Sequence, residues 1–415
     1  MGREWSTYLD DQGRLILPKE AIDLLRLSPG DQVQIEENHS GLHFNPRFPP
    51  LAKIYVEPTS VCNLKCRMCI RNVWNETTGS MSDAVFDRIL EGIRSCAAPP
   101  SVIFGGFGEP LAHHGIVDMV SQTKAERARV EIITNGTLLN EACAQDLIDA
   151  GLDRLWVSLD GAQPEGYADV RLGADIQDVL TNIERFAAMR VPRQHPVPEI
   201  GIVFVAMKRN IGDLPQLLVK GRELGATHFM VTNLWPHTDE LREEILYTRT
   251  LASNDCLGSA DIPALKAPRM DIHEWAREPL YQAICGRWNM HFVGGRNGFE
   301  GNHCPFIEDN ALAIAWDGSV SPCLPLLHSS EGYLNSVKRF NSSWPLGNVA
   351  EHQLLELWGA PEHVEFRGKV RDFDFAPCAI CDGCPQSETN DEDCYGNTFP
   401  TCGGCLWAWG IIQCP

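Results

Sequence analysis

The chain has 415 residues, of which 44% are hydrophobic and 22% are charged, and its formal net charge is −20. This length predicts two or three domains with enough apolar material for a large core. The negative charge argues against a protein that works mainly on DNA or on an anionic membrane, because phosphate groups repel an acidic surface. No apolar run reaches the length of a membrane span and the first residues do not form a secretory signal, so we expect a cytoplasmic protein without membrane contacts.

Residues 1–47 predict a small β-rich domain. Gly13 and Arg14 favour a hairpin turn, Pro18 favours the start of a helix, and residues 29–31 favour a turn into a strand over residues 33–35. This pattern resembles the swapped-hairpin domain of AbrB and MazE proteins, which implies interlocked dimers and, in many members, DNA binding. Residues 1–47 carry eight acidic and five basic side chains, so we favour homodimerisation or partner docking over DNA binding.

Residues 48–240 alternate strand-like and helix-like patterns, which predicts an α/β fold with a parallel sheet. Six such units, without a clear seventh or eighth, predict a partial (β/α)6 TIM-like barrel with its site at the carboxyl ends of the strands. We expect residues 241–284 to be a linker with one helix, and residues 285–415 to be a cysteine-rich iron–sulfur domain. The six strands are expected at residues 53–57, 102–104, 130–134, 154–159, 199–206 and 228–233.

The first strand leads into the loop VEPTSVCNLKCRMCIRN, where Cys62, Cys66 and Cys69 have the spacing C-x3-C-x2-C. Three thiolates can hold three irons of a [4Fe–4S] cube and leave the fourth iron open. A structural zinc site would need a fourth protein ligand, and none is obvious nearby, although a distant His or Cys could serve. We predict that these three cysteines are catalytic.

The cysteine loop resembles the signature of the radical S-adenosylmethionine (SAM) superfamily, over about residues 50–235. Met68 departs mildly from this signature, since that position is often aromatic. The resemblance implies that a reduced [4Fe–4S] cluster cleaves SAM to methionine and a 5′-deoxyadenosyl radical, with electrons from a donor such as ferredoxin or flavodoxin. The residues that it assigns to SAM binding are Gly105, Gly106, Gly108 and Glu109 in GGFGEP, Asn135 in TNG, Ser158 and Asp160 in WVSLDGA, and Arg171.

Each of these SAM assignments has an ordinary structural alternative. Glycine pairs are common in strand-to-helix turns, polar strand ends often cap helices, and a charge at a helix end is often solvated. The two extra residues before Glu109 also depart from the usual GGE form, which leaves the contacting atoms open.

The sequence contains 16 cysteines, many of them after residue 300. Cys304 and Cys323 frame a predicted hairpin at Asp317–Gly318, and the run TCGGCLWAWGIIQCP closes the chain. This region resembles a SPASM domain, the auxiliary cluster module of peptide-modifying radical SAM enzymes. By that resemblance, one auxiliary [4Fe–4S] cluster uses Cys285, Cys304, Cys323 and Cys405, and a second uses Cys381, Cys384, Cys402 and Cys414.

The partition of these cysteines is open, because Cys378 and Cys394 could each replace a member. One or two zinc sites with four thiolates are the alternative, since C-x2-C pairs serve both kinds of centre.

Together these features predict a radical SAM maturase that modifies a peptide or protein substrate. The whole arrangement also resembles, more weakly, maturases associated with tungsten-cofactor oxidoreductases. Two alternatives are an iron–sulfur redox-sensing DNA-binding regulator, against which the charge argues, and a cluster-carrying scaffold without SAM chemistry.

Overall fold

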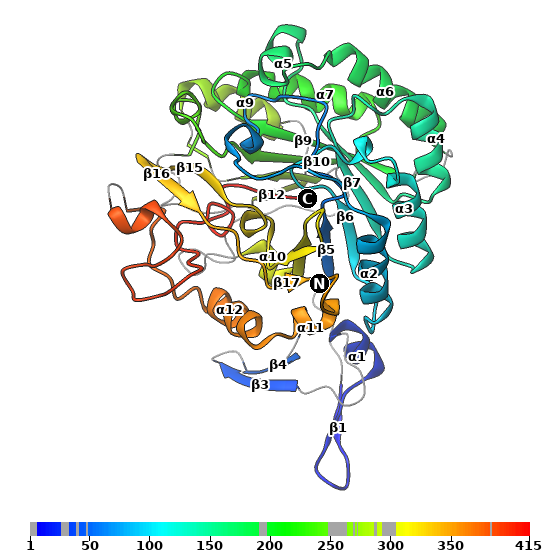
Figure 1. The fold of residues 1–415 in the computed structure, drawn as a ribbon, viewed down its shortest axis with the longest axis vertical. Coiled ribbons are helices and arrows are strands. Elements are labelled where there is room, and N and C mark those ends of the chain that lie inside the picture. The colour runs from blue at the N-terminus through cyan, green and yellow to red at the C-terminus, as the bar shows by residue number, and fades with distance from the viewer. Residues whose placement is uncertain are drawn as a thin grey trace.

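The computed structural model describes residues 6–25, 33–38, 41–46, 49–190, 197–247, 264–268, 270–271, 273–285, 289–292, 304–381 and 384–415. Its main feature is an open, largely parallel sheet with helices outside it (Figure 1). The strand order is β12-β11-β10-β9-β8-β7-β6-β5-β13-β14-β17. The strands from β12 to β13 in this order run parallel to one another, and β14 runs in the opposite direction, antiparallel to both β13 and β17. The strands of this sheet are β5 (Lys53–Val56), β6 (Ser101–Phe104), β7 (Val130–Thr134), β8 (Arg154–Ser158), β9 (Glu199–Ala206), β10 (His228–Asn233), β11 (Ala264–Ala267), β12 (Asn289–Phe292), β13 (Ala311–Ile314), β14 (Ser319–Ser321) and β17 (Gly347–Asn348).

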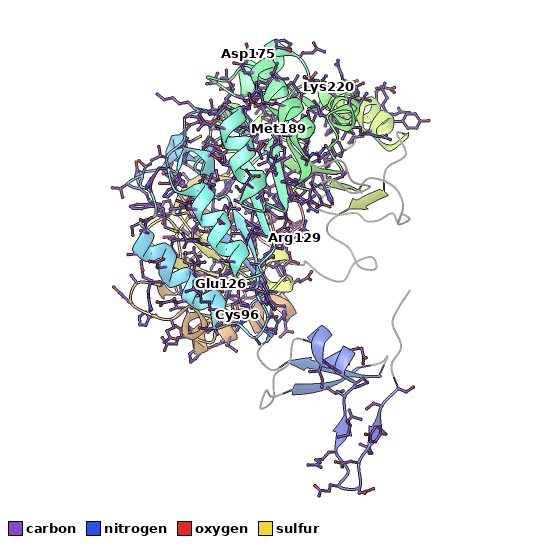
Figure 2. The ribbon with its side chains drawn as sticks, turned by 90° about the vertical axis from the view of Figure 1, so that its right-hand side faces the viewer. Cys96, Glu126, Arg129, Asp175, Met189 and Lys220 are labelled. Carbon is purple, nitrogen blue, oxygen red and sulfur yellow. The ribbon has the colours of Figure 1, made fainter. Side chains whose placement is uncertain are left out.

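Several of the helices that alternate with these strands begin at polar caps that the sequence supplies. Ser82 accepts a hydrogen bond from the Val85 amide, and Asn140 accepts one from the Cys143 amide, so both satisfy amides that a helix start leaves free. Figure 2 looks onto this helical layer. Its helices are α2 (Asp83–Arg94), α3 (Ile116–Ala125), α4 (Glu141–Asp149), α5 (Pro164–Val170), α6 (Ile176–Met189), α7 (Leu214–Glu223), α8 (Asp239–Arg242) and α9 (Glu274–Cys285).

The six predicted strands form β5 to β10 in the expected order, but the expectation of only six units was wrong. Strands β11 and β12 extend the parallel sheet beyond β10, and β13 joins its other side by pairing with β5. The predicted linker, residues 241–284, therefore contains β11, and α9 packs against α7. The sequences of β11 and β12, ALKA and NMHF, mix polar with apolar residues over only four positions, so neither forms the apolar run that marks β5 or β6.

The two faces of the sheet have different partners. Ile54 and Val56 of β5 lie in the core between sheet and helices, whereas Tyr55 faces the other way, into a second core built mainly from residues after 300. We call this second side the inner face. The end of the described chain lies along it, since the Asn233 amide donates to the Ile411 carbonyl (3.0 Å) and the Tyr55 hydroxyl donates to the Pro415 carbonyl (2.6 Å). The cysteine-rich region is thus packed directly onto the barrel interior.

The C-terminal region is mostly irregular between its short elements. The predicted hairpin at Asp317–Gly318 is present as the β13–β14 pair. The remaining elements are α10 (Pro305–Glu308), β15 (Ser330–Leu334), β16 (Val337–Asn341), α11 (Leu354–Trp358), α12 (Pro361–Asp372), and the 3-10 helices η1 (Ile70–Val73), η2 (Pro110–Ala112), η3 (Ile211–Asp213), η5 (Leu324–Leu326) and η6 (Pro385–Glu388).

The N-terminal elements agree with the predicted hairpin turn at Gly13, the helix after Pro18 and the strand over residues 33–35, whereas the predicted turn at residues 29–31 lies outside the described residues. They are β1 (Tyr8–Leu9), β2 (Leu15–Ile16), α1 (Lys19–Leu25), β3 (Val33–Asn38) and β4 (Gly41–Pro46), with Gly13 at φ +74° in the first turn. They form two separate two-stranded sheets, in a small unit apart from the main body (Figure 2). The interlocked dimer and the division of the chain into four domains stay predictions. No helix in the described ranges has the length and apolar character needed to cross a bilayer.

Candidate functional site

The three-cysteine loop begins directly after β5, at the carboxyl edge of the parallel sheet. Cys66 is buried, and Cys62 and Cys69 are partly exposed. Burial raises the pKa of the Cys62 and Cys66 thiols, so bare thiolates are disfavoured there. A bound cation would reverse this, because a coordinating thiol gives up its proton to the metal centre.

Hydrogen bonds to its backbone, rather than a helix or a strand, fix the conformation of the loop. The Arg71 guanidinium donates to the Ser60 carbonyl (3.0 Å) and to the Leu64 carbonyl (3.1 Å). On its other side, the Arg67 amide donates to the Val170 carbonyl (3.0 Å). These contacts fix the loop between η1 and the end of α5, and present its sulfurs at the sheet edge.

The glycines of GGFGEP allow the end of β6 to pack onto the segment that leads to the cysteines. Gly106 has φ +107°, and a Cβ there would lie 2.8 Å from the Cβ of Glu57. A Cβ on Gly108 would lie 1.9 Å from the Thr59 carbonyl oxygen, a contact that backbone cannot accommodate. Both positions therefore require glycine for packing, whatever further contact they make with SAM.

Glu109 ties the ends of β6 and β7 together. Its carboxylate accepts hydrogen bonds from the Thr134 hydroxyl (2.6 Å), the Asn135 amide (2.8 Å) and the Leu111 amide (3.0 Å). The side chain is buried, and burial raises its pKa. The Glu109 carboxylate thus already accepts three hydrogen bonds from the protein. Its predicted contact with the SAM ammonium stays a prediction.

Asn135, directly after β7, and Arg171, directly after α5, bring hydrogen-bond donors to the cysteine sulfurs. The Asn135 side-chain amide donates to Cys62 Sγ at 3.8 Å, and Arg171 Nη1 donates to Cys66 Sγ at 3.9 Å. Donors at this range favour negative charge on sulfur. The three predicted motifs GGFGEP, TNG and SLDG thus meet the cysteine loop at one edge.

Asp160 and Arg171 form a buried ion pair beside Cys66. Arg171 Nε and Nη2 lie 2.6 and 2.5 Å from Asp160 Oδ2, and Asp160 Oδ1 accepts from the Val205 amide (2.7 Å). Burial alone would lower the pKa of Arg171, but the charges of Asp160 and Cys66 raise it, so the guanidinium is a fixed cation. The structure therefore turns both side chains toward each other and the cysteine loop; their predicted contacts with SAM stay predictions. Ser158, at the end of β8, is only partly buried.

Sequence reasoning missed a triad formed by the buried Glu57 and His328 and the partly exposed Glu76. His328 Nε2 lies 2.8 Å from Glu57 Oε2, and Nδ1 lies 2.6 Å from Glu76 Oε2. Since both ring nitrogens face carboxylate oxygens, both must donate, and the ring is an imidazolium. Burial would lower the pKa of His328, but the two glutamates outweigh it and raise the pKa. The sequence contained two signals for this triad: Glu57 directly follows an apolar strand, and His328 directly follows the apolar run LPLL.

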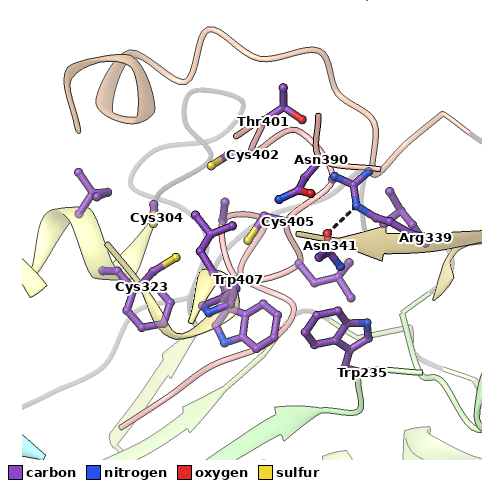
Figure 3. Close-up of a pocket in the computed structure, with 18 of the residues that line it drawn as sticks. Trp235, Cys304, Cys323, Arg339, Asn341, Asn390, Thr401, Cys402, Cys405 and Trp407 are labelled. Atoms are coloured by element: carbon purple, nitrogen blue, oxygen red, sulfur yellow. Dashed lines mark hydrogen bonds between the residues drawn. The ribbon is translucent and has the colours of Figure 1, made fainter. Parts of the chain in front are cut away.

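In the C-terminal region, one pocket is lined by Cys304, Cys323, Cys402 and Cys405, beside Trp407 (Figure 3). Burial raises the pKa of all four thiols, that of Cys304 to about 12. The predicted partition, which assigns Cys402 and Cys405 to different clusters, stays a prediction. The Cys405 amide donates to the Cys402 carbonyl (3.0 Å), so one tight turn holds both cysteines on the same pocket. The side chain of Cys285, the predicted fourth member, lies outside the described residues.

Burial raises the pKa of the Cys378 thiol. Cys414 Sγ accepts a hydrogen bond from Trp407 Nε1 (3.3 Å), a side chain that lines the same pocket. The predicted assignment of Cys381, Cys384 and Cys414 to a second cluster stays a prediction.

These thiols suit clusters better than single metal ions. In the described ranges, no three His, Cys, Asp or Glu side chains converge closely enough to hold one ion. Zinc needs four ligands at about 2.3 Å from one centre, whereas the ligands of a cluster bind different irons and lie farther apart. The donor sets at Cys62–Cys69 and in the C-terminal pocket therefore fit iron–sulfur clusters.

Comparison with known proteins agrees with this geometry. Residues 56–217 match the model of the radical SAM superfamily, and residues 304–385 match SPASM, an iron–sulfur cluster-binding domain. The tungsten-containing aldehyde ferredoxin oxidoreductase cofactor-modifying protein of Pyrococcus furiosus is 30% identical over 366 residues, which cover 87% of this chain and 96% of that protein. The chain belongs to the radical SAM superfamily. As a radical SAM enzyme it uses a [4Fe–4S] cluster and SAM, together with auxiliary iron–sulfur clusters in its SPASM domain.

Two further proteins are similar to this chain over most of its length. The PqqA peptide cyclase of Gluconobacter oxydans is 25% identical, over 85% of this chain and 90% of that protein. SuiB of Streptococcus suis, crystallised with S-adenosylmethionine, superposes with a TM-score of 0.53 at 18% identity, over 80% of this chain and 71% of that one, which supports the fold. The AbrB/MazE resemblance of residues 1–47 finds no support in these comparisons.

Proposed function

We propose that this radical SAM enzyme is a maturase that modifies a peptide or protein in a tungsten oxidoreductase system. The observation that carries the proposal is the similarity to the Pyrococcus cofactor-modifying protein over 87% of this chain and 96% of that protein. Similarity to a peptide cyclase over a comparable length supports a peptide as the modified group.

The proposal gives the chain's residues defined tasks. When bound, the cluster and SAM supply a 5′-deoxyadenosyl radical. Cys62, Cys66 and Cys69 hold that cluster, and Arg171 and Asn135 stabilise negative charge on its sulfurs. The glycine motif and Ser158 line the sheet edge where SAM binds. A ferredoxin or flavodoxin supplies the electron.

The test is co-production of a tungsten-containing aldehyde oxidoreductase with this chain or with its Cys62→Ala, Cys66→Ala, Cys69→Ala variant. We expect a mass change in the oxidoreductase polypeptide, or in its extracted cofactor, only with the unaltered chain. Separate mass spectra of polypeptide and cofactor tell these two targets apart. Identical masses and identical aldehyde oxidation in both samples would refute the proposal.

A substrate-dependent readout adds a second arm. The reconstituted enzyme, reduced anaerobically with dithionite in the presence of SAM, should release 5′-deoxyadenosine. Addition of the purified, unmodified oxidoreductase should increase that release, because substrate binding places a hydrogen donor beside the radical. No increase would count against this substrate while leaving SAM cleavage intact.

A further inference from the structure

The two residues that lengthen the glycine motif, Phe107 and Gly108, lie next to a segment of the C-terminal region. The Phe107 amide donates to Glu57 Oε1 (3.0 Å), and the other oxygen of this carboxylate, Oε2, lies 2.8 Å from His328 Nε2. Glu57 and His328 are only 1% and 7% exposed, so water competes little with either contact. One buried carboxylate thus joins the glycine motif to His328.

The ring of Phe107 contacts the same histidine. Its centroid lies 5.6 Å from that of His328 and 5.2 Å from that of Trp74, both in edge-to-face geometry. The centroids of Trp74 and His328 are 4.4 Å apart, so the three rings pack as one group. The position of Phe107 therefore depends on His328 through both its backbone and its side chain.

Glu76 fixes the position of His328 in turn. Glu76 Oε2 lies 2.6 Å from His328 Nδ1, and Glu76 Oε1 accepts a hydrogen bond from the Ser329 amide (2.8 Å). In the described ranges, the charged side chains that contact the ring nitrogens of His328 are Glu57 and Glu76. Because Glu76 holds both the ring of His328 and the backbone of Ser329, the ring has a fixed orientation toward Glu57.

The glycine motif needs such a contact, because its own backbone is permissive. Gly106 has φ +107°, a conformation in which glycine is free to move among several alternatives. A Cβ on Gly106 would lie 2.8 Å from the Cβ of Glu57, so Glu57 packs directly against this residue as well as bonding to the next one. Glu57 thus restricts the part of the motif that lacks a side chain of its own.

We propose that His328 is a positioning residue for SAM binding, which fixes the glycine motif through Glu57 and Phe107, so that the C-terminal region completes the SAM site of the barrel. This inference rests on the proposed function only in placing SAM at the glycine motif. It does not depend on which peptide or protein the enzyme modifies, and its test needs neither that substrate nor SAM cleavage.

The measurement is the dissociation constant (Kd) of SAM for the reconstituted full-length enzyme, by anaerobic equilibrium dialysis with radiolabelled SAM and without a reductant. Glu57→Ala removes the carboxylate, whereas Glu57→Gln keeps an acceptor for the Phe107 amide. His328→Phe keeps a ring against Trp74 and Phe107 but loses both ring donors. The iron content and the thermal unfolding midpoint of each variant are recorded beside its Kd.

Two further variants serve as references. Glu131→Ala is the matched control, because Glu131 is also a buried carboxylate and accepts a hydrogen bond from Trp156 Nε1 (2.7 Å), but lies near the amino end of β7. Gly108→Ala deforms the glycine motif directly, since its Cβ overlaps the Thr59 carbonyl, and so reports whether SAM binds there.

We expect Glu57→Ala and His328→Phe to raise the Kd of SAM about tenfold at unchanged iron content. Glu57→Gln should restore the Kd of the unaltered protein. Glu131→Ala should lower the unfolding midpoint without changing the Kd, and an equal rise of the Kd in this control would reduce His328 to a purely structural role.

An unchanged Kd in folded Glu57→Ala or His328→Phe, beside a raised Kd in Gly108→Ala, would overturn the inference. An unchanged Kd in Gly108→Ala as well would overturn the placement of SAM at the glycine motif, and the inference with it. If Glu57→Ala and His328→Phe do not fold, Glu76→Ala decides, because this side chain is 34% exposed and its loss should raise the Kd about threefold. An unchanged Kd in Glu76→Ala would then count as refutation.

Discussion

Replacement of His328 by Gln should destabilise the protein strongly and in a pH-dependent way. The imidazolium is the cation between Glu57, whose side chain is fully buried, and Glu76, which is 34% exposed. Removal of one partner of a buried pair costs about 3–5 kcal/mol, because the other charge is left uncompensated. The contact with the partly exposed Glu76 adds at most about 1 kcal/mol to the free energy of unfolding. We therefore expect a loss of about 3 kcal/mol, since the glutamine amide can still donate one hydrogen bond to Glu57.

The pH dependence follows from the raised pKa of folded His328. Below the unfolded value of about 6.5, the ring is protonated in both states and the pair contributes fully. As the pH rises through the higher folded pKa, the imidazolium loses its proton and the contribution disappears. The wild-type advantage over His328→Gln should thus be largest near pH 6 and shrink toward pH 9, within the range in which histidine titrates.

The assay is the apparent midpoint of anaerobic thermal unfolding at one scan rate, with the reconstituted enzyme. A loss of about 3 kcal/mol should lower that midpoint by several degrees. His352→Gln is the control, because His352 is exposed and its loss should move the midpoint little. A deficit of the same size at every pH, or one no larger than that of the control, would refute the assignment of a charged pair.

Three further changes test the geometry of the two cluster regions. Gly108→Ala should lower the free energy of unfolding by more than about 2 kcal/mol and abolish 5′-deoxyadenosine release, because the added Cβ overlaps the Thr59 carbonyl. Gly212→Ala is the control, since its Cβ meets open space and the variant should keep activity. Equal activity of the two variants would contradict the packing argument. Cys402→Ala should lower the iron content of the C-terminal region more than Cys414→Ala, because only Cys402 lines the pocket of four cysteines; equal losses on iron analysis would favour the partition predicted from sequence, which places both in one cluster. Arg171→Met should leave Asp160 buried without its cation, which should lower the free energy of unfolding by about 3–5 kcal/mol and reduce the iron bound at the catalytic site. Full iron loading with unchanged stability would show that this ion pair is dispensable.

Much of the barrel could be predicted because its signals are local. Strands β5 to β10 are apolar runs of four to eight residues, and capped helices separate several of them. Strand β13 was recognised as part of a hairpin, but not as the neighbour of β5. That pairing joins residues more than 250 positions apart, and no local pattern encodes it.

The same distinction separates the two cysteine regions. Cys62, Cys66 and Cys69 lie within eight residues, so their spacing alone defines a donor set. The C-terminal cysteines come from segments that are distant in the chain, and chain folding decides which of them share a pocket. Cys402 and Cys405 illustrate this, since the turn between them places both beside Cys304 and Cys323.

The sequence by itself determined the chemistry of this protein: a cysteine loop at the end of a strand, glycines where backbones approach closely, and a cysteine-rich domain. Only the tertiary structure decided how the charges are compensated. It placed His328 between Glu57 and Glu76, and Arg171 between Asp160 and Cys66. The physical reason is that a buried charge needs a partner in space, and such partners come from any part of the chain.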